Sequence, residues 1–153
     1  MDTCKSVFLK NRLAAHVLKN VAYQPPASVW MGLFSAGIIE TDSEAIKTQK
    51  NGAVMAALRI GELSAANELP GSSNYVRQLV NFGAEPVNGR LLNTDEIRFP
   101  QFTSDVGLVT HWAVLDAQSG GNVLYFGPLE LARLVYMGDT FHVRLETLAI
   151  EDG

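Results

Sequence analysis

The sequence predicts a mainly β protein, a single antiparallel β-sandwich or barrel-like domain with an N-terminal α-helix. Several segments either alternate apolar and polar residues or are apolar over about four to eight positions, which is typical of strands. Clusters of Gly, Asn, Asp, Ser and Pro separate these segments and favour tight turns. Residues 6–21, near the N-terminus, show a helical spacing of apolar residues.

The N-terminal helix is predicted over residues 6–21. Ser6 or Thr3 can cap it, because a hydroxyl can accept a hydrogen bond from an amide of the first turn. The helix must end before Pro25 and Pro26, which lack amide donors and disfavour helical geometry at the preceding residue. One apolar stripe at i, i+4 spacing runs along it: Leu9, Leu13, Val17 and Val21.

Residues 28–35 read as a strand with both faces buried, which suits a central strand of a sandwich. The next segment, residues 36–66, is the least determined. Ser43 followed by Glu44 favours a short helix to about residue 50, and Asn51-Gly52 then favours a turn. Residues 53–60 fit either a strand or a helix.

The second half of the chain predicts strands at residues 75–82, 96–99 and 139–150. Asn88-Gly89 is typical of a type I′ turn. The best-specified feature is a hairpin, in which apolar runs at 108–115 and 123–126 flank a loop at 116–122. Glycine permits positive φ in this loop, and its Asp, Ser and Asn side chains can satisfy turn amides.

Length and composition predict one domain over residues 1–153, with no internal repeat. The net charge of −4 gives no general attraction for nucleic acid or anionic lipid. The longest uncharged run, residues 21–39, contains proline and glycine breakers and is a poor membrane span. A single cysteine, Cys4, excludes an internal disulfide and fits folding in a reducing compartment.

The search for chemistry yields no catalytic, cofactor-binding or metal-binding residue, so we expect neither an enzyme nor a cofactor. His16, His111 and His142 lie far apart in sequence; we expect His111 to pack within its strand and His142 to be solvated. Cys4 has no partner base and reads as a flexible, incidental thiol. No phosphate-binding loop, nucleophile elbow or calcium-loop spacing occurs.

Aromatic residues leave one binding alternative open. Trp30 and Trp112 are expected to fill the core, together with other large apolar side chains. If Tyr23, Trp30, Tyr75 and Trp112 were instead exposed on one face, they could form a platform for a host surface sugar.

The order of turn and strand signatures along almost the whole chain outside residues 36–66 resembles the small tailed-bacteriophage virion proteins described as tail-fibre-like. One departure is Val106, where members of the family often have a tryptophan before the glycine. The signatures that carry the resemblance follow the N-terminal helix in this order: Tyr23-Gln24-Pro25-Pro26-Ala27, Val29-Trp30-Met31-Gly32-Leu33-Phe34, Glu68-Leu69, Gly71, Tyr75-Val76-Arg77-Gln78, Ile97-Arg98-Phe99-Pro100, Gly107-Leu108-Val109-Thr110-His111, Asp116-Ala117, Gly120-Gly121-Asn122, Tyr125-Phe126-Gly127 and Gly138-Asp139-Thr140.

The resemblance implies a non-catalytic virion structural protein, made in the host cytoplasm and bound to other virion proteins, either major capsid or tail proteins. Residues 36–66 then read as an insertion. Because no shaft repeat is present, we expect a compact unit, with a capsid-decorating (cement) protein or surface knob as the first hypothesis. A tail fibre, tail or baseplate component and a carbohydrate-binding module are the alternatives. We expect a homo-oligomer, with a trimer as one candidate, and no nucleic acid or membrane partner.

Overall fold

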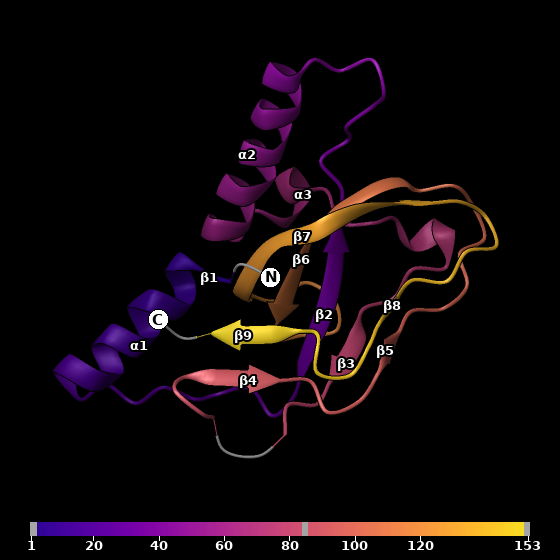
Figure 1. Ribbon diagram of the computed structural model, residues 1–153. Coiled ribbons are helices and arrows are strands. Elements are labelled where there is room, and N and C mark those ends of the chain that lie inside the picture. Colours follow the sequence, from indigo (N-terminus) through magenta and orange to yellow (C-terminus); the bar gives the residue numbers. More distant parts are fainter. Residues whose placement is uncertain (1–2, 84–85, 152–153) are drawn as a thin grey trace.

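The computed structural model describes residues 3–83 and 86–151, and strands dominate this part of the chain (Figure 1). The helices are α1 (Val7–Lys19), α2 (Glu44–Ile60) and α3 (Leu63–Ala66), with a 3₁₀ turn η1 (Gly71–Ser73). The strands are β1 (Cys4–Lys5), β2 (Val29–Phe34), β3 (Gln78–Val80), β4 (Arg90–Leu92), β5 (Ile97–Arg98), β6 (Gly107–Leu115), β7 (Val123–Val135), β8 (His142–Val143) and β9 (Ala149–Glu151).

Five strands form the main sheet in the order β1-β7-β6-β2-β3, and every pair in it is antiparallel. Two small antiparallel ribbons, β4-β9 and β5-β8, complete the β structure. The predicted mainly β, antiparallel class with an N-terminal helix is therefore confirmed. Across residues 3–83 and 86–151 the strands do not close into a barrel, so the barrel-like variant of the prediction does not hold.

Both faces of the main sheet are covered. Successive side chains of a strand point to opposite faces, and consecutive residues of β2 and β6 are buried. On one face Met31, Leu33, Trp112 and Val114 belong to a large core cluster that includes residues of the β5-β8 and β4-β9 ribbons. The residues that face the other way form a second cluster with α2 and α3. Its buried members are Phe34, Val54, Ala57, Leu58, Ala66, Ala113, Leu115, Val123 and Phe126. β2 is thus an interior strand with both faces covered from Met31 to Phe34, as the sequence predicts, and β6 is the middle strand of the sheet.

The predicted hairpin is confirmed as β6 and β7. Gly120 and Gly121 have φ of +64° and +72°, and the Asp116 carboxylate accepts a hydrogen bond from the Asn122 amide at 2.7 Å. β7 continues to Val135, well past the predicted end at residue 126. The register shifts between Val109 and His111, which pair with Arg133 and Pro128, so β7 carries a bulge there.

The N-terminal helix is confirmed as α1, and Ser6 caps it by accepting a hydrogen bond from the Leu9 amide. The predicted apolar stripe is covered only in part, because Leu13 is half-buried and the last two of its residues are exposed. Leu9 is buried, whereas Val17 and Val21 are 73% and 50% exposed. The reason is the position of α1, whose C-terminal half projects past the edge of the molecule (Figure 1).

Helix α2 resolves the segment that the sequence left undetermined. Ser43 caps it as expected, but the predicted turn at Asn51-Gly52 is wrong because the helix runs through both residues to Ile60. Burial of Val54, Ala57 and Leu58 at helical spacing against the sheet explains why the helix continues. None of the described helices has the length and apolar character needed to cross a membrane.

Shorter strands replace two of the predicted ones. The segment predicted at 75–82 forms a strand only at β3, and the one predicted at 139–150 is divided into β8 and β9. Asn93, fully buried, causes the division by donating to the Arg144 carbonyl at 2.9 Å and accepting from the Leu148 amide at 2.9 Å. The predicted type I′ turn is confirmed, with φ of +54° at Asn88 and +74° at Gly89.

Candidate functional site: an arginine clamp beneath the hairpin loop

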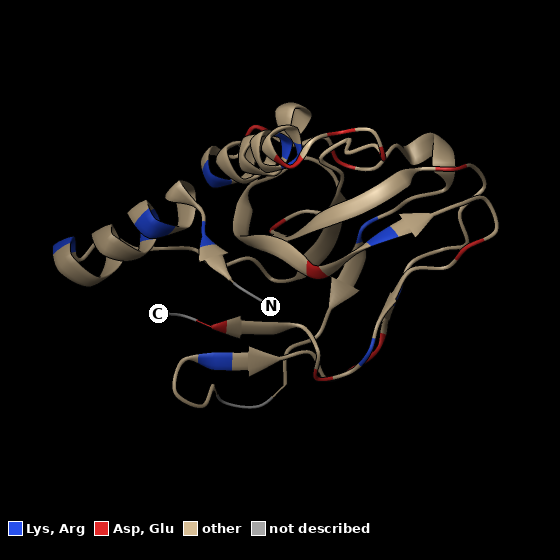
Figure 2. Ribbon diagram, turned by 45° about the horizontal axis from the view of Figure 1, so that its top comes forward, with Lys and Arg blue, Asp and Glu red and all other residues tan. Residues whose placement is uncertain are grey.

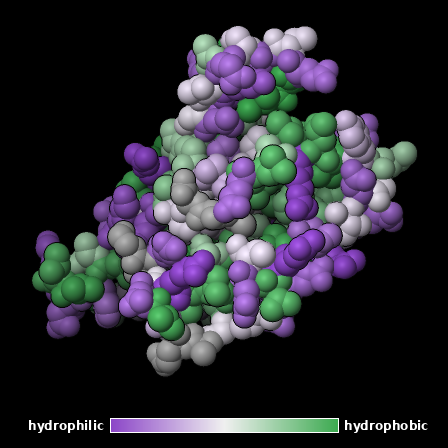
Figure 3. Space-filling view, in the orientation of Figure 1, coloured by the Kyte–Doolittle hydropathy of each residue, from purple (hydrophilic) through white to green (hydrophobic). Residues whose placement is uncertain are grey.

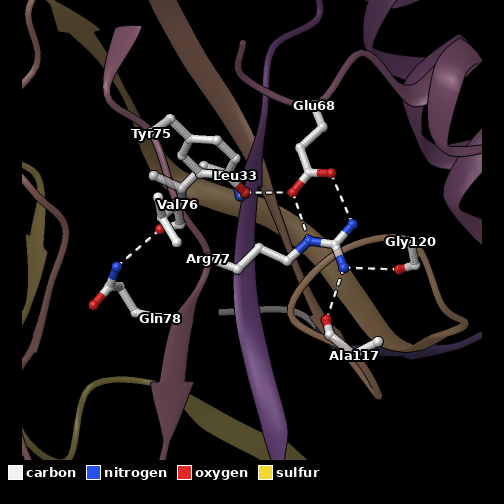
Figure 4. Close-up of polar contacts among 8 residues, drawn as sticks. All are labelled: Leu33, Glu68, Tyr75, Val76, Arg77, Gln78, Ala117 and Gly120. Carbon is white, nitrogen blue, oxygen red and sulfur yellow. Dashed lines mark hydrogen bonds and ion pairs between the residues drawn. The ribbon is translucent and has the colours of Figure 1, made fainter. Parts of the chain in front are cut away.

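Arg77 occupies the centre of a buried polar network (Figure 4). Its guanidinium forms a bidentate pair with Glu68, with Nε–Oε2 and Nη2–Oε1 distances of 2.7 and 2.8 Å. The remaining nitrogen, Nη1, donates to the carbonyl oxygens of Ala117 and Gly120, each at 2.8 Å. The side chain is 3% exposed, so burial leaves the guanidinium dependent on these partners.

Tyr75 links this pair to the main sheet. Its hydroxyl donates to Oε2 of Glu68 and accepts a hydrogen bond from the Leu33 amide of β2 at 3.1 Å. Burial, followed by the negative charge of Glu68, raises the pKa of the Tyr75 hydroxyl above its usual range, so the proton stays on the phenol. The tyrosine ring stacks on Phe99, with centroids 6.0 Å apart.

Arg77 likewise keeps its proton and its positive charge. Burial alone would lower the pKa of its guanidinium, but the hydrogen bonds and charge of Glu68 outweigh this effect and the pKa is raised. Neither Tyr75 nor Arg77 is therefore poised to exchange a proton near neutral pH. The network fastens the β6–β7 loop to the segment between α3 and β3, which are distant in sequence.

A shallow hollow of about 390 Å³ lies over the clamp, lined by Glu68, Tyr75 and Arg77 and by Gln118 and Ser119 of the hairpin loop. Each of the three guanidinium nitrogens of Arg77 already donates to a protein acceptor. The arrangement is thus suited to hold the loop in one shape.

Sequence reasoning placed Arg77 only as one residue of an expected strand. An arginine among apolar neighbours in the segment YVRQLV was the available signal, since arginine is buried only when it is paired. The identity of its partners depends on tertiary contacts, because Glu68 lies nine positions away and the loop carbonyls lie 40 and 43 positions away.

His111 lies within β6, 1% exposed, with Nδ1 2.7 Å from the Thr110 hydroxyl. This confirms the prediction that it packs within its strand. Burial lowers the pKa of its imidazole to about 4, so it is neutral at pH 7. His111 and Thr110 reach the floor of an open groove of about 450 Å³ between α2 and the sheet, which Met55 and Leu129 also line.

The other residues considered for chemistry lie apart from this site. His16 is exposed on α1, and His142 is half-buried on β8 rather than freely solvated. The sequence suggested that Cys4 is a flexible thiol, and this is wrong. Cys4 lies in strand β1 opposite Phe126 of β7 and packs against the second core cluster. Within residues 3–83 and 86–151, no group of three or more His, Cys, Asp or Glu side chains is arranged to hold a metal ion.

The four aromatic residues considered for sugar binding do not share an exposed face. Trp112 and Tyr75 are 0% and 7% exposed and belong to the main core cluster. Trp30 is half-buried rather than fully in the core, and Tyr23 is half-buried in the segment between α1 and β2. A platform made of all four side chains is therefore not assembled.

Together, the doubly covered sheet and a polar clamp whose groups are paired with one another define a β-rich protein in which the site fixes the shape of the hairpin loop. The family model described as Podophage GP4 fiber I protein gp80 matches residues 5–151. The chain therefore belongs to this family of phage fibre proteins, and it is a structural component of the virion, assembled after synthesis in the host. Among curated proteins, none matches the chain.

Proposed function

We propose that the protein is a compact, non-enzymatic unit of a podophage tail fibre. The fibre description of its family, matched over residues 5–151, is the observation that carries this proposal. It favours the tail-fibre alternative over the capsid-decorating hypothesis that the sequence placed first. The absence of shaft repeats in the sequence supports a compact knob or adaptor over a length of shaft.

The Arg77 clamp supports a role in presenting surfaces. A loop on a rigid scaffold can bind a partner without a large cost for ordering it first. The clamp holds the β6–β7 loop through Ala117 and Gly120, so the residues between them have a fixed position relative to the main sheet.

Two features of organisation belong to the same proposal. Residues 1–153 form one domain, and residues 36–66 are an insertion that adds contact surface. Helix α2 buries Val54, Ala57 and Leu58 against the sheet while Ile46 and Ile60 remain 43% and 65% exposed, which supports a layer with one face left for contacts. Several weak contacts of this kind, made by an oligomer to other virion proteins, would add up to stable attachment.

Locating the protein on purified particles tests the proposal. Gold-labelled antibody against the protein should decorate the tail, and the label should be lost from particles made without this protein. Label over the capsid surface, with the tail bare, would overturn the fibre assignment in favour of capsid decoration. Matched particles stained with antibody against the major capsid protein provide the control for access to each part of the virion.

A further inference from the structure

Helix α1 has little support from the rest of the molecule. Of its residues, all of which the structure describes, Leu9 alone is buried. Three apolar side chains at and beyond its C-terminal end, which we name the helix patch, are largely exposed: Val17 at 73%, Leu18 at 82% and Val21 at 50%. Helices shorter than about 12–15 residues are marginal in water without tertiary packing. A partner that covers the helix patch would supply this packing.

The same segment is strongly basic. Residues 3–21 contain Lys5, Lys10, Arg12 and Lys19 and no acidic residue, and Figure 2 shows blue without red on α1. The whole chain has 12 Lys and Arg against 16 Asp and Glu, so acidic groups exceed basic ones over the other residues. Hydrophobic residues also gather over the projecting end of α1 in Figure 3. The expected partner therefore has an apolar surface with acidic residues beside it.

Such a surface lies at the end of the molecule away from α1, where β7 ends (Figure 1). Leu134, Tyr136 and Met137 are 57%, 52% and 69% exposed there. Two carboxylates are held beside them, because Asp105 accepts a hydrogen bond from the Met137 amide and Asp139 accepts one from the Tyr136 amide, each at 2.8 Å. We name these five residues the acidic-end patch.

We propose that the helix patch of one copy of this chain docks on the acidic-end patch of a second copy. The apolar side chains of the two patches would pack together, with Lys10 and Lys19 of α1 near Asp105 and Asp139. The contact joins two different surfaces, so it is heterologous and repeats around a ring, or along a filament if the ring does not close. This self-contact rests on the proposed fibre role and adds to it the surfaces through which copies of the chain bind one another.

The test uses the purified full-length chain and two single variants, Leu18→Glu in the helix patch and Met137→Glu in the acidic-end patch. Leu145→Glu is the matched control, since Leu145 is 56% exposed and belongs to neither patch. Native mass spectrometry and sedimentation velocity over a concentration series measure association. Circular dichroism checks that each variant remains folded.

The wild type and Leu145→Glu should associate equally. Each patch variant alone should bind itself at least about tenfold more weakly, because a glutamate replaces an apolar side chain that the contact buries. An equimolar mixture of the two patch variants should form a heterodimer that does not grow further, because it retains one intact helix patch and one intact acidic-end patch. Added salt should slow association of the wild type.

Three results would overturn the inference: a wild type that stays a single chain throughout the series, patch variants that associate as the wild type does, and a mixture that forms no heterodimer. Labelling of particles is independent of these measurements. A protein found on the tail that fails to self-associate would leave the fibre role standing and refute the head-to-tail contact.

Discussion

Replacing Arg77 by methionine tests whether the clamp stabilises the fold. The change keeps an apolar stem and removes two bonds to Glu68, at 2.7 and 2.8 Å, and two bonds to loop carbonyls, each at 2.8 Å. Breaking a buried ion pair costs about 3–5 kcal/mol, since the remaining charge has lost its partner. The Glu68 side chain is 21% exposed and keeps its bond from Tyr75, so we expect the lower end, about 3 kcal/mol. For a chain of this size, that loss lowers Tm by about 6–12 °C.

Urea unfolding followed by tryptophan fluorescence measures this loss, because Trp112 is fully buried in the folded protein. Arg98→Met is the matched control. Arg98 pairs with Glu96 at 3.0 Å, but the two side chains are 65% and 41% exposed, so its loss should be at most about 1 kcal/mol. The double variant Glu68→Gln/Arg77→Met should recover part of the loss, since no buried charge remains unpaired. Equal losses for Arg77→Met and Arg98→Met would refute the reasoning.

Three further predictions concern stability, each measured by the free energy of urea unfolding. Gly121→Ala should destabilise the protein more than Gly120→Ala, although both residues have positive φ. A Cβ at Gly121 would meet a carboxylate oxygen at 2.5 Å, whereas a Cβ at Gly120 meets nothing within 4 Å. Equal losses of unfolding free energy would contradict the clash. Burial keeps the pKa of His111 at about 4, against about 6.5 when unfolded, so lowering the pH from 6.5 to 5 should cost about 1.6 kcal/mol through this residue. The unfolded state gains the proton first, and His111→Gln should show a correspondingly smaller loss with pH; an unchanged slope would exclude His111 as the cause. In the single chain, Leu9→Ala should cost about 2–4 kcal/mol and Leu18→Ala under about 0.5 kcal/mol, because Leu9 is 4% and Leu18 is 82% exposed. A large loss for Leu18→Ala would show that Leu18 is covered within its own chain.

The fold was predictable where local chemistry and burial agree. Asn88-Gly89 produces a type I′ turn because both residues adopt positive φ at low cost. Ser6 and Ser43 cap α1 and α2 through hydroxyls that reach the first-turn amides. Each of these features depends on residues within a few positions of one another.

The errors arose where distant contacts determine local structure. Asn51-Gly52 does not form a turn, because helix α2 gains more by burying Leu58 and its neighbours on the sheet than a glycine costs within a helix. The alternation after Asp139 does not yield one strand, since the side chain of Asn93 binds the backbone at Arg144 and Leu148.

For the candidate site too, the sequence supplies the residues and the tertiary contacts decide how they are arranged. The sequence contains the arginine, the glutamate and the tyrosine of the clamp, but only the tertiary structure brings Glu68, Tyr75 and Arg77 beneath the hairpin loop. The turn and strand signatures of the sequence were also enough to reveal its resemblance to phage fibre proteins, and the family match confirms this resemblance.

By itself, the sequence determined the β-rich class, the turns at Asn88-Gly89 and in the hairpin loop, and the helix caps, because period, turn chemistry and capping act over short distances. The tertiary structure alone decided which apolar stripes are buried. Leu9 and Val17 belong to one stripe of α1, yet Leu9 is buried and Val17 is exposed. A periodic pattern specifies which residues share a face, and the neighbours that cover that face come from elsewhere in the chain or from another molecule.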